Sequence, residues 1–205
     1  MSIHRKFEEH TGLLIFGILA VSAIGGLVQI LPILNQESLE TAAANTRVYD
    51  AVELTGRDIY IREGCHVCHS QQIRPLIAEV ERYGPYSRSG EFVYDRPFLW
   101  GSKRTGPDLH RVGGKFSDEW HEIHLIDPRA VVEKSIMPAY PWLANRSAAG
   151  VGNITAKLNA LRTLGHPYSD EEIQGADASL EGLTEMDALI AYLQMLGTGF
   201  SEDES

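Results

Sequence analysis

The sequence has very little cysteine, and its cysteine lies in one place. Among 205 residues only Cys65 and Cys68 are cysteines, and they are three positions apart. A small secreted domain held together by disulfides normally carries more cysteines at wider spacing. The pair therefore indicates a chemical motif and not a disulfide framework.

Positive charge is also scarce. The 18 Lys and Arg residues are outnumbered by 28 Asp and Glu residues, which gives a formal net charge of −10. Nucleic-acid binding needs Lys and Arg against phosphate, so it is not expected here. The acidic charge either attracts a basic protein partner or only keeps the domain soluble, and both interpretations stay open.

Charge is absent altogether from residues 12–34. A helix of that length spans roughly 34 Å, enough to cross a hydrocarbon core of about 30 Å. The run exceeds the roughly 7–15 apolar residues of a cleaved signal peptide, so we expect a retained anchor. Arg5 and Lys6 precede it, and no Lys or Arg follows before Arg47. The positive-inside rule then predicts a cytoplasmic N-terminus and an external domain.

Residues 65–69 read Cys-His-Val-Cys-His, the C-x-x-C-H pattern of c-type haem attachment. Two thiols at this spacing reach the two vinyl groups on one haem edge, and His69 reaches the iron from one face. A redox-active or zinc-binding pair is the alternative. The following histidine and the lack of other cysteines disfavour it. We expect one covalent haem c, attached to Cys65 and Cys68, with His69 as an axial ligand.

An electron-carrying haem needs a sixth ligand, because an open iron binds small molecules instead. Met137 lies in a non-repetitive stretch where Pro138 fixes the backbone, which suits a ligand loop. Met186 and Met195 fall on a helical pattern and indicate packing, and Met1 precedes the membrane segment. We therefore predict Met137 as the second axial ligand.

Histidines elsewhere are the alternatives to Met137, namely His110, His121 and His124. His121 and His124 are three residues apart in a predicted helix at 117–126. Two such histidines can bind a metal. No carboxylate partner stands at an obvious spacing, so we expect them to be surface histidines.

Four further residues are candidates for contacts around the haem. Pro107 lacks an N–H, and its carbonyl is expected to accept a hydrogen bond from His69 Nδ1. Arg74, Trp100 and Arg104 are candidates to meet the haem propionates. Ordinary surface or packing roles are equally compatible with these three residues.

The helical pattern predicts a mainly α protein: one transmembrane helix plus a class I cytochrome c-like domain. Terminal helices are predicted at 48–62 and 184–196, where Thr184 begins the second and Gly197 ends it. Gly56 on the first helix allows the second to cross closely. Two long loop insertions, 71–103 and 143–181, exceed a minimal haem domain and are expected to bind a partner. No nucleophile and general base stand out.

The predicted organisation has five parts. They are a cytoplasmic N-terminus (1–11), a transmembrane helix (12–34), a linker (35–46), a periplasmic c-type cytochrome domain (47–199) and an acidic tail (200–205).

Extended strings along the chain resemble a known family, subunit II of the cbb3-type (class C) haem–copper cytochrome c oxidases, which is the monohaem subunit. The strings are GRDIYIREGCHVCHSQQIRP, ERYGPYS, YDRPFLWGSKRTGPDLHRVG, DPRAVVEKSIMPAYPWL and AYLQMLG. C-x-x-C-H alone names only c-type cytochromes, whereas these strings are much more specific.

The resemblance implies that Cys65 and Cys68 carry the haem and that His69 and Met137 are its axial ligands. It also implies an electron-transfer subunit without its own catalytic site, anchored in a bacterial inner membrane with its haem domain in the periplasm. Electrons would arrive from a dihaem cytochrome c subunit, fed by a soluble cytochrome c. They would pass to haem b of the catalytic haem–copper subunit, where oxygen reduction drives proton pumping.

Three other functions share the anchored haem domain. One is the anchored monohaem cytochrome of nitric oxide reductase, which is shorter and lacks long insertions. Another is a free-standing membrane-anchored cytochrome c. A haem-based sensor with an open iron is the third, and it requires that Met137 be unbound or displaceable.

Overall fold

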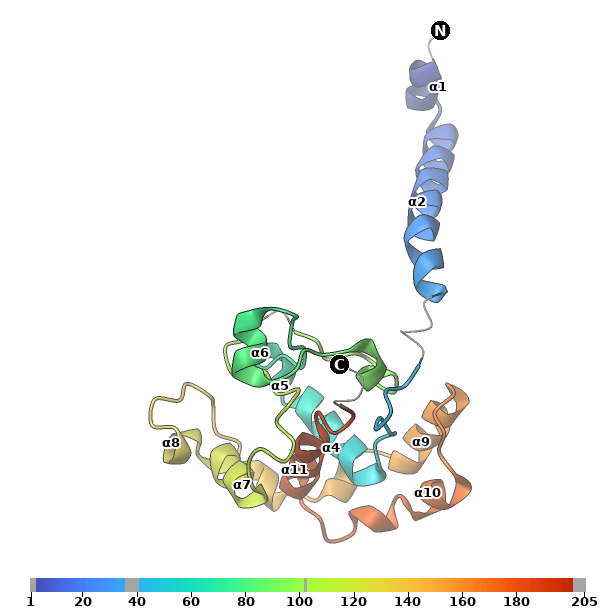
Figure 1. Cartoon of the computed structure of the whole chain (residues 1–205). Coiled ribbons are helices and arrows are strands. Elements are labelled where there is room, and N and C mark those ends of the chain that lie inside the picture. The colour runs from blue at the N-terminus through green and yellow to red at the C-terminus, as the bar shows by residue number, and fades with distance from the viewer. Residues whose placement is uncertain (1–2, 36–40, 102, 201–205) are drawn as a thin grey trace. The chain divides into compact units, whose positions relative to one another are not determined.

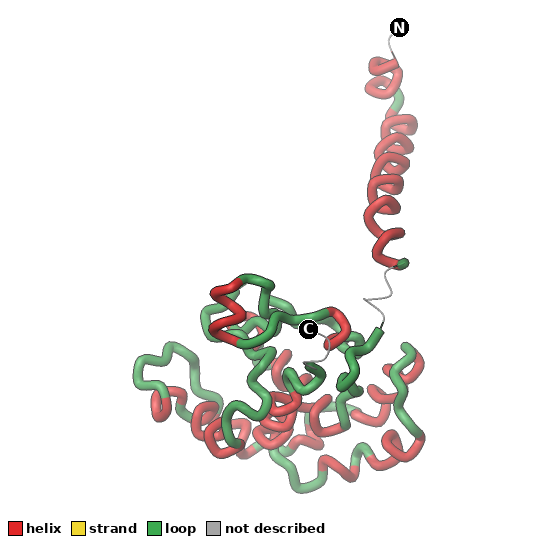
Figure 2. Tube along the Cα trace, in the orientation of Figure 1, coloured by secondary structure: helices red, strands yellow, loops and turns green. Residues whose placement is uncertain are grey.

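The computed structural model describes residues 3–35, 41–101 and 103–200. The chain divides into two compact units between Thr41 and Ala42. Helices joined by loops make up both units, and the described residues contain no β-strand (Figure 2). The prediction of a mainly α protein is confirmed.

The first unit consists of α1 (Ile3–Glu9) and α2 (Thr11–Leu34). With 24 residues, α2 is roughly 36 Å long, and none of its residues is buried. Within the described residues it is the one helix long and apolar enough to cross a membrane. Pro32 lies in its last turn, where an interrupted backbone hydrogen bond costs little. The helix thus has the length and composition that the sequence predicts for an anchor.

Two helices form the centre of the second unit, α4 (Ala51–Arg62) and α11 (Glu185–Met195) (Figure 1). Each begins at a capping box, in which the side chains of the first and fourth residues bond each other's backbone N–H. Asp50 starts α4 and Thr184 starts α11. Because Asp50 caps the helix, α4 begins three residues after the predicted start, whereas the predicted cap at Thr184 is confirmed.

The two central helices cross at Gly56. A Cβ atom there would lie 1.9 Å from the carbonyl oxygen of Ala188 and 2.8 Å from Tyr192 Cβ. No other residue fits this approach without moving backbone. Tyr60 and Leu189 are almost fully buried beside the crossing. The close crossing predicted from Gly56 is confirmed, and it fixes the end of α4 from which the cysteine motif continues.

The remaining helices of the second unit are short. The α-helices are α5 (Cys65–Cys68), α6 (Ile77–Tyr83), α7 (Asp118–Ile126), α8 (Pro128–Val131), α9 (Ile154–Thr163) and α10 (Asp170–Gly175). The 3-10 turns are η1 (Ser89–Phe92), η2 (Pro141–Asn145), η3 (Ala148–Gly150) and η4 (Ala178–Leu180). In Figure 1, α7 and α8 lie to one side of the central pair, and α9 and α10 lie to the other.

Both insertions are packed into this unit and contain helices of their own. The 71–103 insertion holds α6 and η1, and its buried Asp95 pairs with Arg57 of α4 (Oδ1 to Nε, 3.6 Å). The 143–181 insertion holds α9 and α10. Its Leu158 is 1% exposed, and Tyr168 OH donates to the Tyr49 carbonyl at 2.8 Å. Both insertions therefore contribute buried side chains to the core, while other side chains of each stay exposed.

Candidate haem site

The cysteine motif forms a single helical turn directly after α4. Gly64 links the two helices with a φ of 74°, a left-handed conformation that favours glycine. Within the turn, Cys65 and Cys68 are three residues apart and share one face. Burial raises the pKa of the Cys65 thiol to about 12. A buried thiol that keeps its proton is a weak redox nucleophile. Among the described residues the pair also lacks the further His, Cys, Asp or Glu ligands that a zinc site needs.

His69 is held by a carbonyl from a distant segment. Its Nδ1 atom lies 2.8 Å from the carbonyl oxygen of Pro107. Since a carbonyl only accepts, Nδ1 must carry the proton and Nε2 keeps its lone pair. Burial lowers the pKa of His69, although the Pro107 carbonyl acts in the opposite sense. A neutral imidazole with a free Nε2 is the form that binds a metal.

Gly106 allows this contact. A Cβ atom at Gly106 would lie 2.2 Å from His69 Cε1 and 2.7 Å from Nδ1. The imidazole therefore lies close against a backbone that carries no side chain at that point. The sequence interpretation missed Gly106, although its position directly before Pro107 was a usable signal.

A cavity of about 630 Å³ opens beside the cysteine turn. Its volume is within the roughly 300–1,000 Å³ typical of cofactor sites. Cys65, Cys68, His69 and Met137 all line it. Apolar side chains make up much of the remaining wall, including Tyr60, Leu109, Val112, Leu125, Leu189 and Leu193. Residues 72 positions apart in the sequence, from 65 to 137, thus meet around one apolar space.

Met137 is half-buried in the loop between α8 and η2. Its backbone N–H lies 3.2 Å from Ser135 Oγ, and the loop ends where Tyr140 N donates to the Leu125 carbonyl at 2.7 Å. Met186 is 2% exposed in the core, and neither it nor Met195 lines the cavity. Among the methionines of the described residues only Met137 does so, and Met1 lies outside these residues.

Two histidines of α7 also line the cavity, His121 and His124. His121 is 3% exposed, and the ring of His124 stacks on Trp120 with centroids 4.7 Å apart. The expectation of surface histidines is therefore wrong. The cause is that this face of α7 turns toward the cavity, which the local sequence does not specify. No group of three His, Cys, Asp or Glu residues suited to a metal ion occurs in the part of the chain that the structure describes.

The three propionate candidates do not line the cavity. Arg74 and Arg104 both pair with Glu79 instead. Trp100 stacks on Phe98, with ring centroids 4.8 Å apart. Other cations line the cavity, namely Arg82, Arg111, Lys115 and Lys134. The sequence interpretation did not single out these four, since nothing in their local spacing distinguishes them from surface charges.

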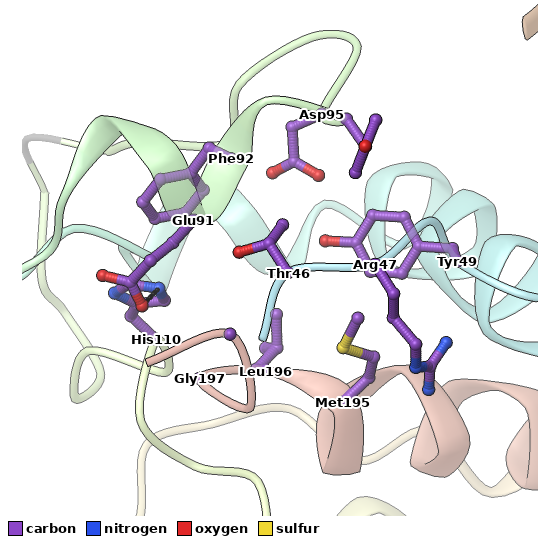
Figure 3. A pocket seen from close by; sticks show the side chains of 12 residues that line it. Thr46, Arg47, Tyr49, Glu91, Phe92, Asp95, His110, Met195, Leu196 and Gly197 are labelled. Atoms are coloured by element: carbon purple, nitrogen blue, oxygen red, sulfur yellow. Dashed lines mark ion pairs between the residues drawn. The ribbon is translucent and has the colours of Figure 1, made fainter. Parts of the chain in front are cut away.

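A second pocket lies between the start of α4, η1 and the end of α11 (Figure 3). Its volume of about 20 Å³ admits nothing larger than a water molecule. His110 lines this pocket, with Nε2 3.3 Å from Glu91 Oε2 and Nδ1 beside Ser87 Oγ. His110 does not line the large cavity. Of the three histidines considered as alternatives to Met137, only the two on α7 remain.

The residues around the large cavity fit a c-type haem. They supply two thiols at the attachment spacing, a neutral imidazole and a thioether, which are the groups that such a haem requires. The apolar lining suits the porphyrin faces, and the cations suit two carboxylates.

Comparison with known protein families matches residues 4–184 to one described as "Cytochrome C oxidase, mono-heme subunit/FixO". The match covers most of the 205 residues and ends just before α11. A comparison with curated proteins gave no match. The family description favours an oxidase over nitric oxide reductase and implies a haem. The chain belongs to the monohaem (FixO) subunit family of cytochrome c oxidases.

Proposed function

We propose that this chain relays electrons within a cbb3-type cytochrome c oxidase through one covalently bound haem c. A haem c supplies a couple that takes up and releases one electron. The observation that carries the proposal is that Cys65, Cys68, His69 and Met137 line one cavity of about 630 Å³. The relay runs from the dihaem cytochrome c subunit, supplied by a soluble cytochrome c, to haem b of the catalytic subunit.

Each of these residues has a separate task. Cys65 and Cys68 hold the haem through thioether bonds, and His69 presents Nε2 because Pro107 occupies Nδ1. Met137 supplies a thioether, which favours ferrous iron and gives a higher potential than a second histidine. Oxygen reduction and proton pumping belong to the partner subunit, so the chain acts as a non-catalytic subunit.

The anchor helix determines on which side of the membrane we place each part of the chain. The apolar α2 holds the protein in the bacterial inner membrane, with residues 1–11 in the cytoplasm and 12–34 spanning the bilayer. Arg5 and Lys6 before the helix support this direction. Residues 35–46 are the linker, 47–199 form the periplasmic cytochrome domain, and 200–205 are an acidic tail.

The 71–103 insertion is the surface that we propose for subunit contact. Apolar side chains with large exposed fractions gather in it, among them Ile77 at 80%, Phe98 at 52% and Leu76 at 51%. Three aromatic side chains of the insertion are also exposed, Phe98, Tyr86 and Trp100, and aromatic residues are enriched at protein interfaces. Phe92 of the same insertion is 4% exposed, so it packs inward and is not part of this surface.

Purification of the intact complex through a tag on this chain tests the proposed function. We expect the haem–copper catalytic subunit and the dihaem cytochrome c subunit to co-purify. Oxygen consumption with a reduced soluble cytochrome c should require His69. Co-purification with a nitric oxide reductase subunit, or full oxygen consumption in His69→Ala, would contradict the proposal.

The contact surface is tested by Ile77→Glu together with Phe98→Glu. These changes should release the partner subunits while the haem spectrum stays normal. Ile123→Glu is the matched control, because Ile123 is 48% exposed, lies outside both insertions and does not line the cavity. Equal loss of subunits in both variants would place the interface elsewhere.

A further inference from the structure

Asp108 is a buried carboxylate directly behind the contact between His69 and Pro107. Its side chain has no exposed surface. Three neighbouring groups donate to it: Ser70 Oγ at 2.5 Å, Gln72 N at 3.0 Å and His110 N at 2.8 Å. Nothing in the proposed relay so far uses this carboxylate.

The bonds of Asp108 belong to a larger junction of two segments, 68–72 and 106–110. Backbone hydrogen bonds flank the His69–Pro107 contact: Gly106 N to Cys68 O at 3.0 Å and Leu109 N to Ser70 O at 2.9 Å. The carboxylate of Asp108 adds side-chain bonds to both segments. It therefore fixes the Pro107 carbonyl relative to the imidazole that this carbonyl orients.

Arg104 is the cation nearest to this carboxylate among the ion pairs of the structure. One guanidinium nitrogen lies 3.5 Å from Asp108 Oδ2, and Nε donates to Ser70 Oγ at 2.7 Å. Arg104 also pairs with Glu79 at 2.7 Å, so its charge is shared between two carboxylates. Asp108 is close to the imidazole, since it follows Pro107, whose carbonyl bonds His69 Nδ1, and accepts from Ser70, which follows His69.

We propose that Asp108 and Arg104 are positioning residues that set the reduction potential of the haem bound at His69, with opposite signs. This inference rests on the proposed function. A buried negative charge beside the ligand stabilises the more positive, ferric state, and burial limits screening by salt. A carbonyl held firmly on Nδ1–H also strengthens the imidazole as a ligand. Asp108 thus lowers the potential, and Arg104 raises it by offsetting Asp108.

Anaerobic redox titration of the full-length chain tests this proposal, with the visible spectrum recorded at each step. Asp108→Asn should shift the one-electron equilibrium about tenfold toward the ferrous form, equivalent to about 59 mV. Arg104→Gln should shift it several-fold toward the ferric form. Asp108→Glu, which keeps the charge, should return most of the wild-type potential.

Asp95→Asn is the matched control. Asp95 is 3% exposed and pairs with an arginine, but it does not line the cavity. In this variant the one-electron equilibrium constant of the haem should stay within twofold of the wild-type value. This variant separates the charge at the His69 junction from the loss of any buried ion pair.

The directions of the two potential shifts distinguish the proposal from a purely structural role. If Asp108 and Arg104 only hold the fold, both substitutions weaken His69 ligation, give high-spin spectra and shift the potential in one direction. That result, or no shift in either variant, would overturn the proposal. If Asp108→Asn does not fold, a raised or unchanged potential in Arg104→Gln overturns it alone. A wild-type chain without a covalent low-spin haem would instead contradict the proposed function.

Discussion

Two walls of the cavity, one with His69 and one with Met137, are built differently. The His69 wall, residues 68–72 and 106–110, is joined by backbone hydrogen bonds and by a carboxylate with no exposed surface. The Met137 wall, residues 132–140, is looser. Met137 N has a single side-chain bond to Ser135 Oγ, and the adjacent Ile136 is 77% exposed.

This difference indicates a division of labour. The His69 wall holds its imidazole in one tautomer and one orientation before any metal is bound. The Met137 wall is tied to α7 and α8 by bonds from Tyr140 N to the Leu125 carbonyl and from Arg129 Nε to the Ser135 carbonyl, and neither of these is made by Met137 itself. We therefore expect damage to the His69 wall to be more severe than damage to the Met137 wall.

The largest effect is expected from removing the imidazole itself. His69→Ala should abolish the low-spin haem spectrum and reduce electron transfer to near background, because His110, the other histidine of that wall, does not line the cavity. The visible spectrum of the reduced protein measures this. His66→Ala, within the same motif, is the control and should keep the low-spin spectrum. Loss of the low-spin spectrum in His66→Ala but not in His69→Ala would show that His66, and not His69, is the iron ligand.

Removing the thioether should have a smaller effect than removing the imidazole. Met137→Leu should keep the haem but open the iron, so that carbon monoxide binds to the ferrous form. Met137→His should stay low-spin and lower the potential by at least about 59 mV, a tenfold change. Redox titration and spectra with carbon monoxide measure both.

Met186→Leu is the control for these variants, because Met186 is buried in the core and does not line the cavity. If the Met137→Leu protein stays low-spin and does not bind carbon monoxide, another group is the ligand. His121 and His124 would then be the residues to replace next, since both line the cavity.

A third prediction concerns the packing of the His69 wall. Gly106→Ala places a methyl group where only 2.2 Å separates it from His69 Cε1. Such overpacking costs about 1–3 kcal/mol of stability, and the shift of the imidazole should also change the haem spectrum. Denaturant unfolding followed at the haem band measures this. Gly150→Ala, with no atom within 4 Å of the added methyl group, should leave both unchanged.

The smallest effect is expected in the Met137 wall. Ser135→Ala removes the hydroxyl that accepts from Met137 N and should cost about 0.5–1.5 kcal/mol. The measurement is the denaturant concentration at which the thioether ligand is lost, seen before global unfolding. A cost larger than that of Gly106→Ala would mean that the Met137 wall is the more rigid of the two.

The features that were predicted correctly from the sequence are those set by residues close together in the chain. The cysteine turn, the Thr184 cap and the glycine crossing each rest on a few adjacent residues or on one face of a helix. The anchor helix rests on a continuous apolar run. These features depend little on what the rest of the chain does.

The partners of charged and polar side chains escaped prediction because they come from distant segments. Arg74 and Arg104 turn to Glu79, not to the cavity. His121 and His124 face the cavity only because α7 packs with that face inward. Gly106 and Asp108 flank Pro107, yet their importance appears only when residues 106–110 lie against residues 68–72.

The most direct test of the account is the covalent haem content of the full-length chain. Non-covalent haem is extracted with acidified acetone, and the mass of the peptide containing Cys65 and Cys68 is then measured by mass spectrometry. The account predicts one haem per chain that resists extraction and adds its mass to this peptide, and none in Cys65→Ala with Cys68→Ala. Haem that is fully extractable from the wild type, or that persists in the double variant, would contradict it.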